Sequence, residues 1–258
     1  MFRTGKIFDF LALLLTAIFV YAWIYLSKRG SHVEIRPLAA IDAIDEMIGS
    51  AAEKGKKVLF VPRGSLGSGL HAPQVIAGLS LLPRVAQRSA EYGVPIQVAY
   101  SEPTIGPLIM DGLETGFIMA GSPDHMKDDT IMFYPDMTHT MGILGLINER
   151  GNEAGAVVHV GSYYHETIIW GEAGMTVGAM QIGGTANIGQ LAFMITCFDF
   201  TLLGEELFAA GAYMSKDPIQ IGSIRGQDWS KMVSLIVTIL ATLCATFGLD
   251  AFQNLIGM

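Results

Sequence analysis

The sequence predicts a Rossmann-like, three-layer α/β domain with a mostly parallel sheet, flanked by an N-terminal and a C-terminal transmembrane helix. Short apolar runs alternate with segments of helical periodicity through the middle of the 258 residues, as in a parallel sheet that is covered on both faces. Long apolar segments also stand near both ends of the chain. We therefore expect an anchor over residues 1–30, one α/β domain over 31–228 and a second transmembrane helix over 229–258.

The first apolar segment runs from Ile7 to Leu26 and contains one charged residue, Asp9. Twenty residues suffice to span a bilayer as a helix, and the aromatic residues in the second half of the segment are typical of the membrane interface. A secretory signal peptide is the alternative. No small-residue cleavage site follows the segment, so we interpret it as a retained anchor.

The central region begins with a helix over 38–54, in which Leu38, Ile41, Ile44 and Ile48 recur at helical spacing between Pro37 and Gly55. The apolar run "KVLFV" then predicts a buried strand, and the same alternation continues along the chain. The expected strands cover 57–61, 96–100, 130–134, 156–160 and 175–182. The expected helices after the first cover 73–92, 103–120, 138–149 and 188–214.

The second long apolar segment, Met232 to Leu249, has 18 residues without a charge. A buried core helix is the alternative to a membrane span, but the length and the absence of charge favour the span. Five basic residues flank the two spans on the side of the central domain, against Arg3 and Lys6 outside. The positive-inside rule then predicts a cell-membrane protein with a cytoplasmic central domain.

The net charge of −8 excludes nucleic acid as an expected partner, because no basic stripe is present to replace its counterions. The two cysteines, Cys197 and Cys244, lie in apolar sequence and suggest no disulfide framework. The histidines lack the spacing of a zinc motif, and no cofactor fingerprint is complete. We therefore predict neither a metal nor a cofactor.

A candidate ligand site follows from the topology, because open α/β sheets bind ligands at the carboxyl ends of their strands. The loop "VPRGSLGSGLHAP" (61–73) follows the first strand but lacks the lysine and the glycine spacing of phosphate-binding loops. A turn with left-handed backbone angles is favoured there over an anion site. The candidate residues at the strand ends are Arg63, Gly64, Ser65, Ser101, Glu102, Asp136, His165, Thr185 and Asn187.

The expected helix over 188–214 is apolar on nearly all sides, yet it contains three acidic residues. Such a helix is buried in a core or between subunits. We expect it to form the interface of a homo-oligomer, with Phe198, Asp199, Leu202 and Glu206 at the seam.

The segments "IRPLAAIDAIDEMIGSAAEKGKKVLFVP" and "GGTANIGQLAFMITCFDFTLLGEELFAAGAYMS" resemble an uncharacterised family of prokaryotic membrane proteins. The resemblance implies an N-terminal anchor, a Rossmann-like cytoplasmic domain and at least one C-terminal span; it implies no activity and no catalytic residue. From the residues, the favoured function is a homo-oligomeric scaffold at the membrane without catalysis of its own. The alternative is a membrane-bound enzyme or small-ligand sensor that uses the strand ends.

Overall fold

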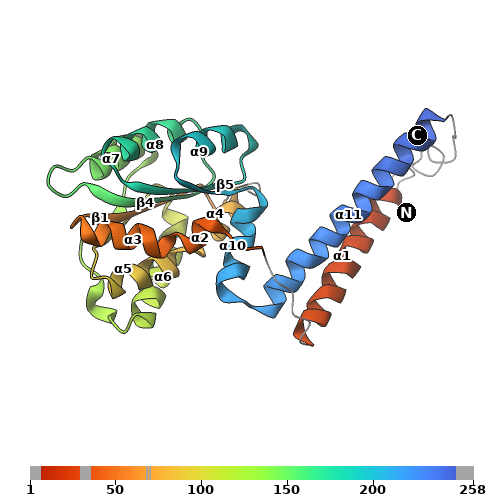
Figure 1. Cartoon of the computed structure of the whole chain (residues 1–258), viewed down its shortest axis with the longest axis horizontal. Helices are drawn as coiled ribbons and strands as arrows, with labels where there is room; N and C mark the ends of the chain where they lie inside the picture. Colours follow the sequence, from red (N-terminus) through yellow and green to blue (C-terminus); the bar gives the residue numbers. More distant parts are fainter. Residues whose placement is uncertain (1–6, 30–35, 68, 70, 248–258) are drawn as a thin grey trace. The chain divides into compact units, whose positions relative to one another are not determined.

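The chain folds into two compact units in the computed structural model. One contains the first and last helices, and the other spans Pro37–Met214. The structure describes residues 7–29, 36–67, 69 and 71–247. Figure 1 shows the larger unit as a sheet between helices and the smaller unit as a pair of helices.

The larger unit is built on a sheet that, among the described residues, has six strands, all parallel. Their spatial order is β3-β2-β1-β4-β5-β6, so the direction of winding reverses between β1 and β4. The strands are β1 (Lys57–Arg63), β2 (Ile96–Tyr100), β3 (Ile131–Phe133), β4 (Ala154–Gly161), β5 (Met180–Thr185) and β6 (Phe200–Leu203). The predicted parallel α/β fold is confirmed.

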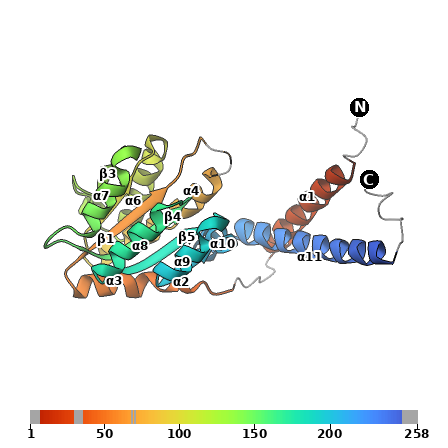
Figure 2. The same cartoon turned by 90° about the horizontal axis from the view of Figure 1, so that it is seen from above.

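Helices cover both faces of this sheet (Figure 1). Successive residues of β1 point to opposite faces, so Val58 and Phe60 belong to one core while Leu59 and Val61 belong to the other. The first core is covered by α2 (Ala39–Asp42), α3 (Ile44–Glu53), α4 (Ala72–Leu79), α5 (Leu82–Glu91), α6 (Gly106–Met119) and α10 (Glu205–Ser215). The second is covered by α7 (Asp136–Ile147), α8 (Glu166–Thr176) and α9 (Leu191–Cys197), which Figure 2 shows from above.

The prediction of one helix over 188–214 is wrong. A short 3₁₀ turn (Ile188–Gln190) leads into α9, and β6 separates α9 from α10. The Asp199 carboxylate accepts a 2.7 Å hydrogen bond from the Gln181 amide and fixes the start of β6 beside β5. Gly204, with φ 57°, then turns the chain from β6 into α10. The all-round apolar pattern arose from three short elements, each of which buries a different side of the segment.

Three further boundaries differ from the sequence prediction. The helix over 38–54 is divided at Ala43 into α2 and α3, and the helix over 73–92 is divided at Ser80–Leu81 into α4 and α5. Residues 175–176 end α8 instead of beginning a strand, because Gly178 (φ 68°) makes the turn that leads into β5. The prediction missed α8, whose polar and apolar residues follow no clear helical period.

The smaller unit pairs α1 (Ile7–Lys28) with α11 (Pro218–Thr246) in antiparallel fashion (Figure 2). The Thr16 and Ser230 hydroxyls lie 2.8 Å apart, and the rings of Trp23 and Trp229 stack with centroids 6.2 Å apart. A Cβ atom on Gly222 would lie 2.6 Å from the Cα of Ile24. Small residues on α11 therefore let the two backbones approach closely, as in membrane helix pairs.

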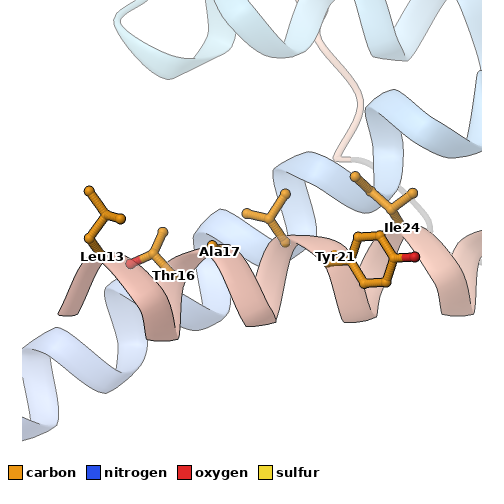
Figure 3. Close-up of a pocket in the computed structure, with 6 residues that line it drawn as sticks. Leu13, Thr16, Ala17, Tyr21 and Ile24 are labelled. Atoms are coloured by element: carbon orange, nitrogen blue, oxygen red, sulfur yellow. The ribbon is translucent and has the colours of Figure 1, made fainter. Parts of the chain in front are cut away.

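The segment Asp9–Lys28 of α1 is long and apolar enough to cross a membrane, and a signal sequence near an N-terminus passes the same test. A second spanning helix is not shown. The predicted C-terminal span extends to Leu249, which lies outside the described residues, as do Arg3, Lys6 and the predicted boundary at residues 30–31. An open hollow of about 600 Å³ lies along one side of α1 (Figure 3). It is lined by Leu13, Thr16, Ala17, Val20, Tyr21 and Ile24.

Candidate functional site

Arg63, the last residue of β1, lies at the centre of a polar network at the carboxyl edge of the sheet. Its Nε donates a 2.8 Å hydrogen bond to Oε1 of Glu166, at the start of α8. Its Nη1 donates to Oδ1 of Asp136 (2.7 Å), at the start of α7, and to the Ser101 hydroxyl (2.6 Å), just beyond β2. One guanidinium thus joins the segments that follow β1, β2, β3 and β4.

The two carboxylates on Arg63 have different surroundings. The Glu166 side chain is 2% exposed, whereas that of Asp136 is 76% exposed. Burial by itself would lower the pKa of the Arg63 guanidinium, but hydrogen bonds to Asp136 and Glu166 outweigh burial and raise it. The hydrogen bond from Arg63 in turn lowers the pKa of the Asp136 carboxyl. Arg63 and Asp136 are therefore both charged around neutral pH.

A second polar group lies beside this network, where β1 and β4 end next to each other. The Ser162 hydroxyl, directly after β4, is 2.7 Å from Nδ1 of His71, and the Tyr164 hydroxyl is 2.9 Å from Nε2 of the same ring. Ser162 is buried, whereas Tyr164 is exposed. The Ser162 amide also donates a 2.8 Å hydrogen bond to the Arg63 carbonyl. His71 thus connects a buried hydroxyl to an exposed one and can relay a proton between them.

The end of β5 closes the site on one side. The Gln74 side-chain oxygen accepts hydrogen bonds from the Ala186 amide (3.1 Å) and the Thr185 hydroxyl (3.4 Å). The Asn187 side chain donates a 2.8 Å hydrogen bond to the Tyr163 carbonyl. These contacts hold the turns after β4 and β5 to the start of α4.

Two glycines allow the backbones at the ends of β1 and β4 to lie close together. Gly64 has φ 116°, as the turn interpretation of its loop predicts, and a Cβ there would lie 2.7 Å from the Val75 side chain. Gly161 has φ 123°, and a Cβ there would overlap the Arg63 carbonyl oxygen. Neither position admits another residue without strain.

The structure brings some of the predicted residues together and leaves others apart. Arg63, Ser101 and Asp136 are in direct contact. Glu102 adjoins Ser101 and accepts a 3.1 Å hydrogen bond from Thr104, while the Ser65 hydroxyl accepts one from the Gly67 amide (3.0 Å) within its own loop. The exposed His165 ring has its Nδ1 3.6 Å from Oε2 of Glu166. Thr185 and Asn187 lie at the neighbouring end of β5.

Sequence reasoning did not select several residues of the site, among them His71, Ser162 and Glu166. Each stands within the segments that follow β1 or β4, so the strand-end rule pointed to the right segments. The rule could not choose Glu166 over its neighbour His165. The structure distinguishes the two because Glu166 is buried and His165 is exposed, and their neighbouring positions in the sequence do not reveal this difference.

Two buried histidines lie behind the site in the second core. His159 on β4 stacks on Trp170, with centroids 5.8 Å apart, and His139 on α7 meets the same ring edge-on at 5.2 Å. Among the described residues, neither imidazole has a hydrogen-bond partner for its nitrogens. Burial lowers the pKa of His159 to about 3, and burial followed by the charge of Arg63 lowers that of His139 to about 4. Both rings are neutral in the folded domain.

The four residues predicted at an oligomer interface do not lie on one helix. Phe198 and Asp199 connect α9 to β6, Leu202 lies in β6 and Glu206 in α10. Phe198 belongs to the second core and Leu202 to the first. The carboxylates of Asp199 and Glu206 accept hydrogen bonds from the amides of Gln181 (2.7 Å) and Leu203 (3.2 Å). The four residues do not share one helical face. The oligomer interface remains a prediction, but the single helix from which it was derived is absent.

In the part of the chain that the structure describes, no group of three or more His, Cys, Asp and Glu side chains lies close enough to hold a metal ion. No curated protein and no solved structure matches the chain. One family model matches residues 1–256, over both units, and carries the description "domain of unknown function". The chain therefore belongs to the DUF6754 family.

Proposed function

We propose that this protein is a membrane-anchored, Rossmann-like domain that binds a small ligand where β1 and β4 end, as a sensor or an enzyme. The observation that carries the proposal is the Arg63–Glu166 ion pair. It stands at the point where the winding of the sheet reverses, which is where open α/β sheets hold ligands.

The chemistry of the site supports a binding role over a purely structural one. Burying a carboxylate is costly, and an apolar pair of similar volume often stabilises a fold as well. Here Glu166 is buried while the Arg63 side chain is 23% exposed, so the ion pair is accessible from the surface of the domain through Arg63. The His71–Ser162 pair next to it adds groups that donate, accept and exchange protons. Convergent polar groups of this kind are typical of ligand sites.

The helix pair supports two membrane spans. The stacked Trp23 and Trp229 place aromatic rings of both helices at one level. The basic residues Lys28, at the end of α1, and Arg29, directly after it, follow Trp23 closely in sequence. This arrangement is typical of a membrane interface. Beyond Trp229, α11 exposes the apolar side chains Leu235, Ile236, Ile239, Leu240 and Leu243. An antiparallel hairpin of two spans puts both chain ends on one side and, by the basic flanks, the α/β domain in the cytoplasm.

A homo-oligomeric scaffold is the second candidate, and the outer faces of α7 to α9 favour it. Met137 is 99% exposed and Ile188 is 85% exposed; Met141, Ile169 and Ile195 are exposed as well. Among the residues of α7, α8 and α9, the charged side chains are Asp136, Glu166 and Glu172. An apolar surface with so few charges is typical of a contact with another protein. Membrane-tethered copies would meet it at high effective concentration.

Ligand binding is tested by enrichment of small molecules. The full-length protein in a non-ionic detergent is incubated with a small-molecule extract of its host cells, filtered and analysed by mass spectrometry. We expect a compound that the wild type retains and that Asp136→Ala loses, because Asp136 is exposed at the site and its removal leaves the core intact. Glu53→Ala, which removes an exposed carboxylate at the end of α3, is the control and should retain the compound. Equal retention by all three proteins, or none by the wild type, would contradict the proposal.

The scaffold candidate is tested by the double substitution Met141→Glu and Ile195→Glu, with native mass spectrometry of the detergent-solubilised protein. Both side chains are exposed, so the domain should stay folded while its assembly is lost. A wild type that is monomeric, or a double variant that keeps the wild-type assembly, rejects this face as the interface.

A further inference from the structure

The carboxyl edge of the sheet has an excess of acidic side chains. Each strand leads through a short segment into the first turn of the next helix, and the described residues of these segments include five carboxylates and one guanidinium. The acids are Glu102, Asp136, Glu166, Glu205 and Glu206, and the base is Arg63. The segments that lead into the strands at the opposite edge are balanced, since Lys54, Lys56, Lys57, Lys127 and Arg150 stand there among acids.

The positive charge of Arg63 is already neutralised within the site. Its Nε and Nη1 both donate to carboxylates, at 2.8 Å and 2.7 Å. A phosphate group placed there would meet the carboxylates of Glu166 and Asp136, and the described residues of these segments supply no second guanidinium or ammonium to balance its charge. Like charges at such separations repel one another even near a protein surface. This edge therefore disfavours nucleotides, which the topology alone would suggest.

Glu166 adds an independent sign of an incomplete site. Its Oε1 accepts the hydrogen bond from Arg63, but Oε2 is buried and, among the described residues, has no hydrogen-bond partner. Nδ1 of the neighbouring His165 ring lies 3.6 Å from Oε2, beyond hydrogen-bonding distance. A buried carboxylate oxygen without a donor is unfavourable. Its negative potential at this edge favours a donor that carries positive charge.

We infer that the ligand of this site carries a protonated amine and no phosphate group. The inference rests on the proposed function and names the ligand class of the same site. An organic cation fits better than a metal ion, because no three potential metal ligands converge among the described residues. The hydroxyls of Ser162 and Tyr164 on His71 provide neighbouring hydrogen bonds for the uncharged part of such a molecule.

Titration calorimetry with the full-length protein tests the inference, with spermidine as the cationic probe and ATP and NAD as the anionic ones. We expect spermidine to bind at physiological salt and ATP and NAD not to bind. Asp136→Asn and Glu102→Gln should each weaken spermidine binding about 5- to 10-fold, the effect of one charge several ångströms away in a partly aqueous site. Glu53→Gln makes the same charge change at the opposite edge and should leave the affinity unchanged, which excludes general attraction to an acidic protein.

Binding of ATP or NAD that Arg63→Gln abolishes would overturn the inference and leave the proposed ligand site standing. Spermidine affinity that is the same in Asp136→Asn and Glu102→Gln as in the wild type would also overturn it, as would no binding of spermidine at all. The enrichment experiment decides separately on the ligand site itself, because it does not depend on the charge of the ligand.

Discussion

Nε of Arg63 donates a 2.8 Å hydrogen bond to Oε1 of Glu166 and so joins the end of β1 to the start of α8 across 103 residues of sequence. The two strands that these residues follow, β1 and β4, are neighbours in the sheet at the point where its winding reverses. The pair holds the walls of the candidate site in place in the free protein. Such preorganisation lowers the cost of binding a ligand.

Stability should depend on the two carboxylates of Arg63 unequally. Glu166→Gln removes the charge of a side chain that is 2% exposed, and we expect a loss of about 2–3 kcal/mol in the free energy of unfolding. Asp136→Asn removes a charge that is mostly in solvent and should cost less than about 1 kcal/mol. Urea unfolding of the two variants measures both values. Equal losses would mean that burial does not set the strength of this network.

The close passage of β1 and β4 predicts a strong effect of Gly161→Ala. A Cβ at Gly161 would overlap the Arg63 carbonyl oxygen at a φ of 123°, so the end of β1 has to move. Gly121→Ala is the matched control, because Gly121 has φ 69° but nothing within 4 Å of the added atom; its cost is the backbone strain of about 1–2 kcal/mol. We expect Gly161→Ala to cost clearly more by thermal unfolding. If the two glycine variants unfold at the same temperature, the backbones of Gly161 and Arg63 are packed less closely than the structure shows.

The buried histidines predict a loss of stability in acid. Each imidazole binds its proton more weakly in the folded domain, with pKa values of about 4 for His139 and about 3 for His159, than in an unfolded chain near 6.5. Their contribution is therefore fully present above pH 6.5 and is lost as the pH falls from there toward 4. The loss is up to about 3 kcal/mol for each ring at pH 4.

Urea unfolding between pH 7 and pH 4 isolates this effect when His159→Phe is compared with the wild type. Phenylalanine keeps an aromatic ring against Trp170, so the variant should lose less stability between pH 6.5 and 4. His165→Gln changes an exposed ring and should follow the wild-type curve. A His159→Phe curve parallel to that of the wild type would show that His159 does not titrate in this way.

The pairing of α1 and α11 predicts a specific cross-link. Thr16→Cys and Ser230→Cys, in a chain whose own cysteines are replaced by serine, should form a disulfide on oxidation, because the two hydroxyls lie 2.8 Å apart. Adding Gly226→Leu should reduce the yield, since even a Cβ there overlaps the Cα of Val20. Thr238→Leu, on an exposed part of the same helix, is the control. Cross-linking that Gly226→Leu leaves unchanged would contradict the packing of the pair.

Much of the sheet could be predicted because its central strands are short runs of mostly apolar residues. The strands β1, β2 and β4 lie where "KVLFV", "IQVAY" and "AVVHV" placed them. The segment "FDFTLLGEE" misled the prediction, because β6 is only four residues long and stands between two short helices that are also apolar. Periodicity cannot separate elements that are shorter than about two helical turns.

The candidate site could be predicted only as a set of loops. Parallel topology brings the carboxyl ends of all strands to one edge, which is how Arg63, Ser101 and Asp136 were chosen and why they meet. The contact between His71 and Ser162 depends on the neighbouring positions of β1 and β4, and strand order could not be read from the sequence. The contacts of Arg63 with Glu166 and of His71 with Ser162 were therefore beyond sequence reasoning, even where their segments were known.

The most direct test of the account is a density map of the full-length protein, equilibrated with the compound that the enrichment experiment retains, at a resolution that defines small molecules. We expect density for that compound at the carboxyl ends of β1 and β4, within hydrogen-bonding distance of the Arg63 network or of His71. Density for the compound along the helix pair, on the outer face of α7 to α9, or nowhere on the α/β domain would contradict it.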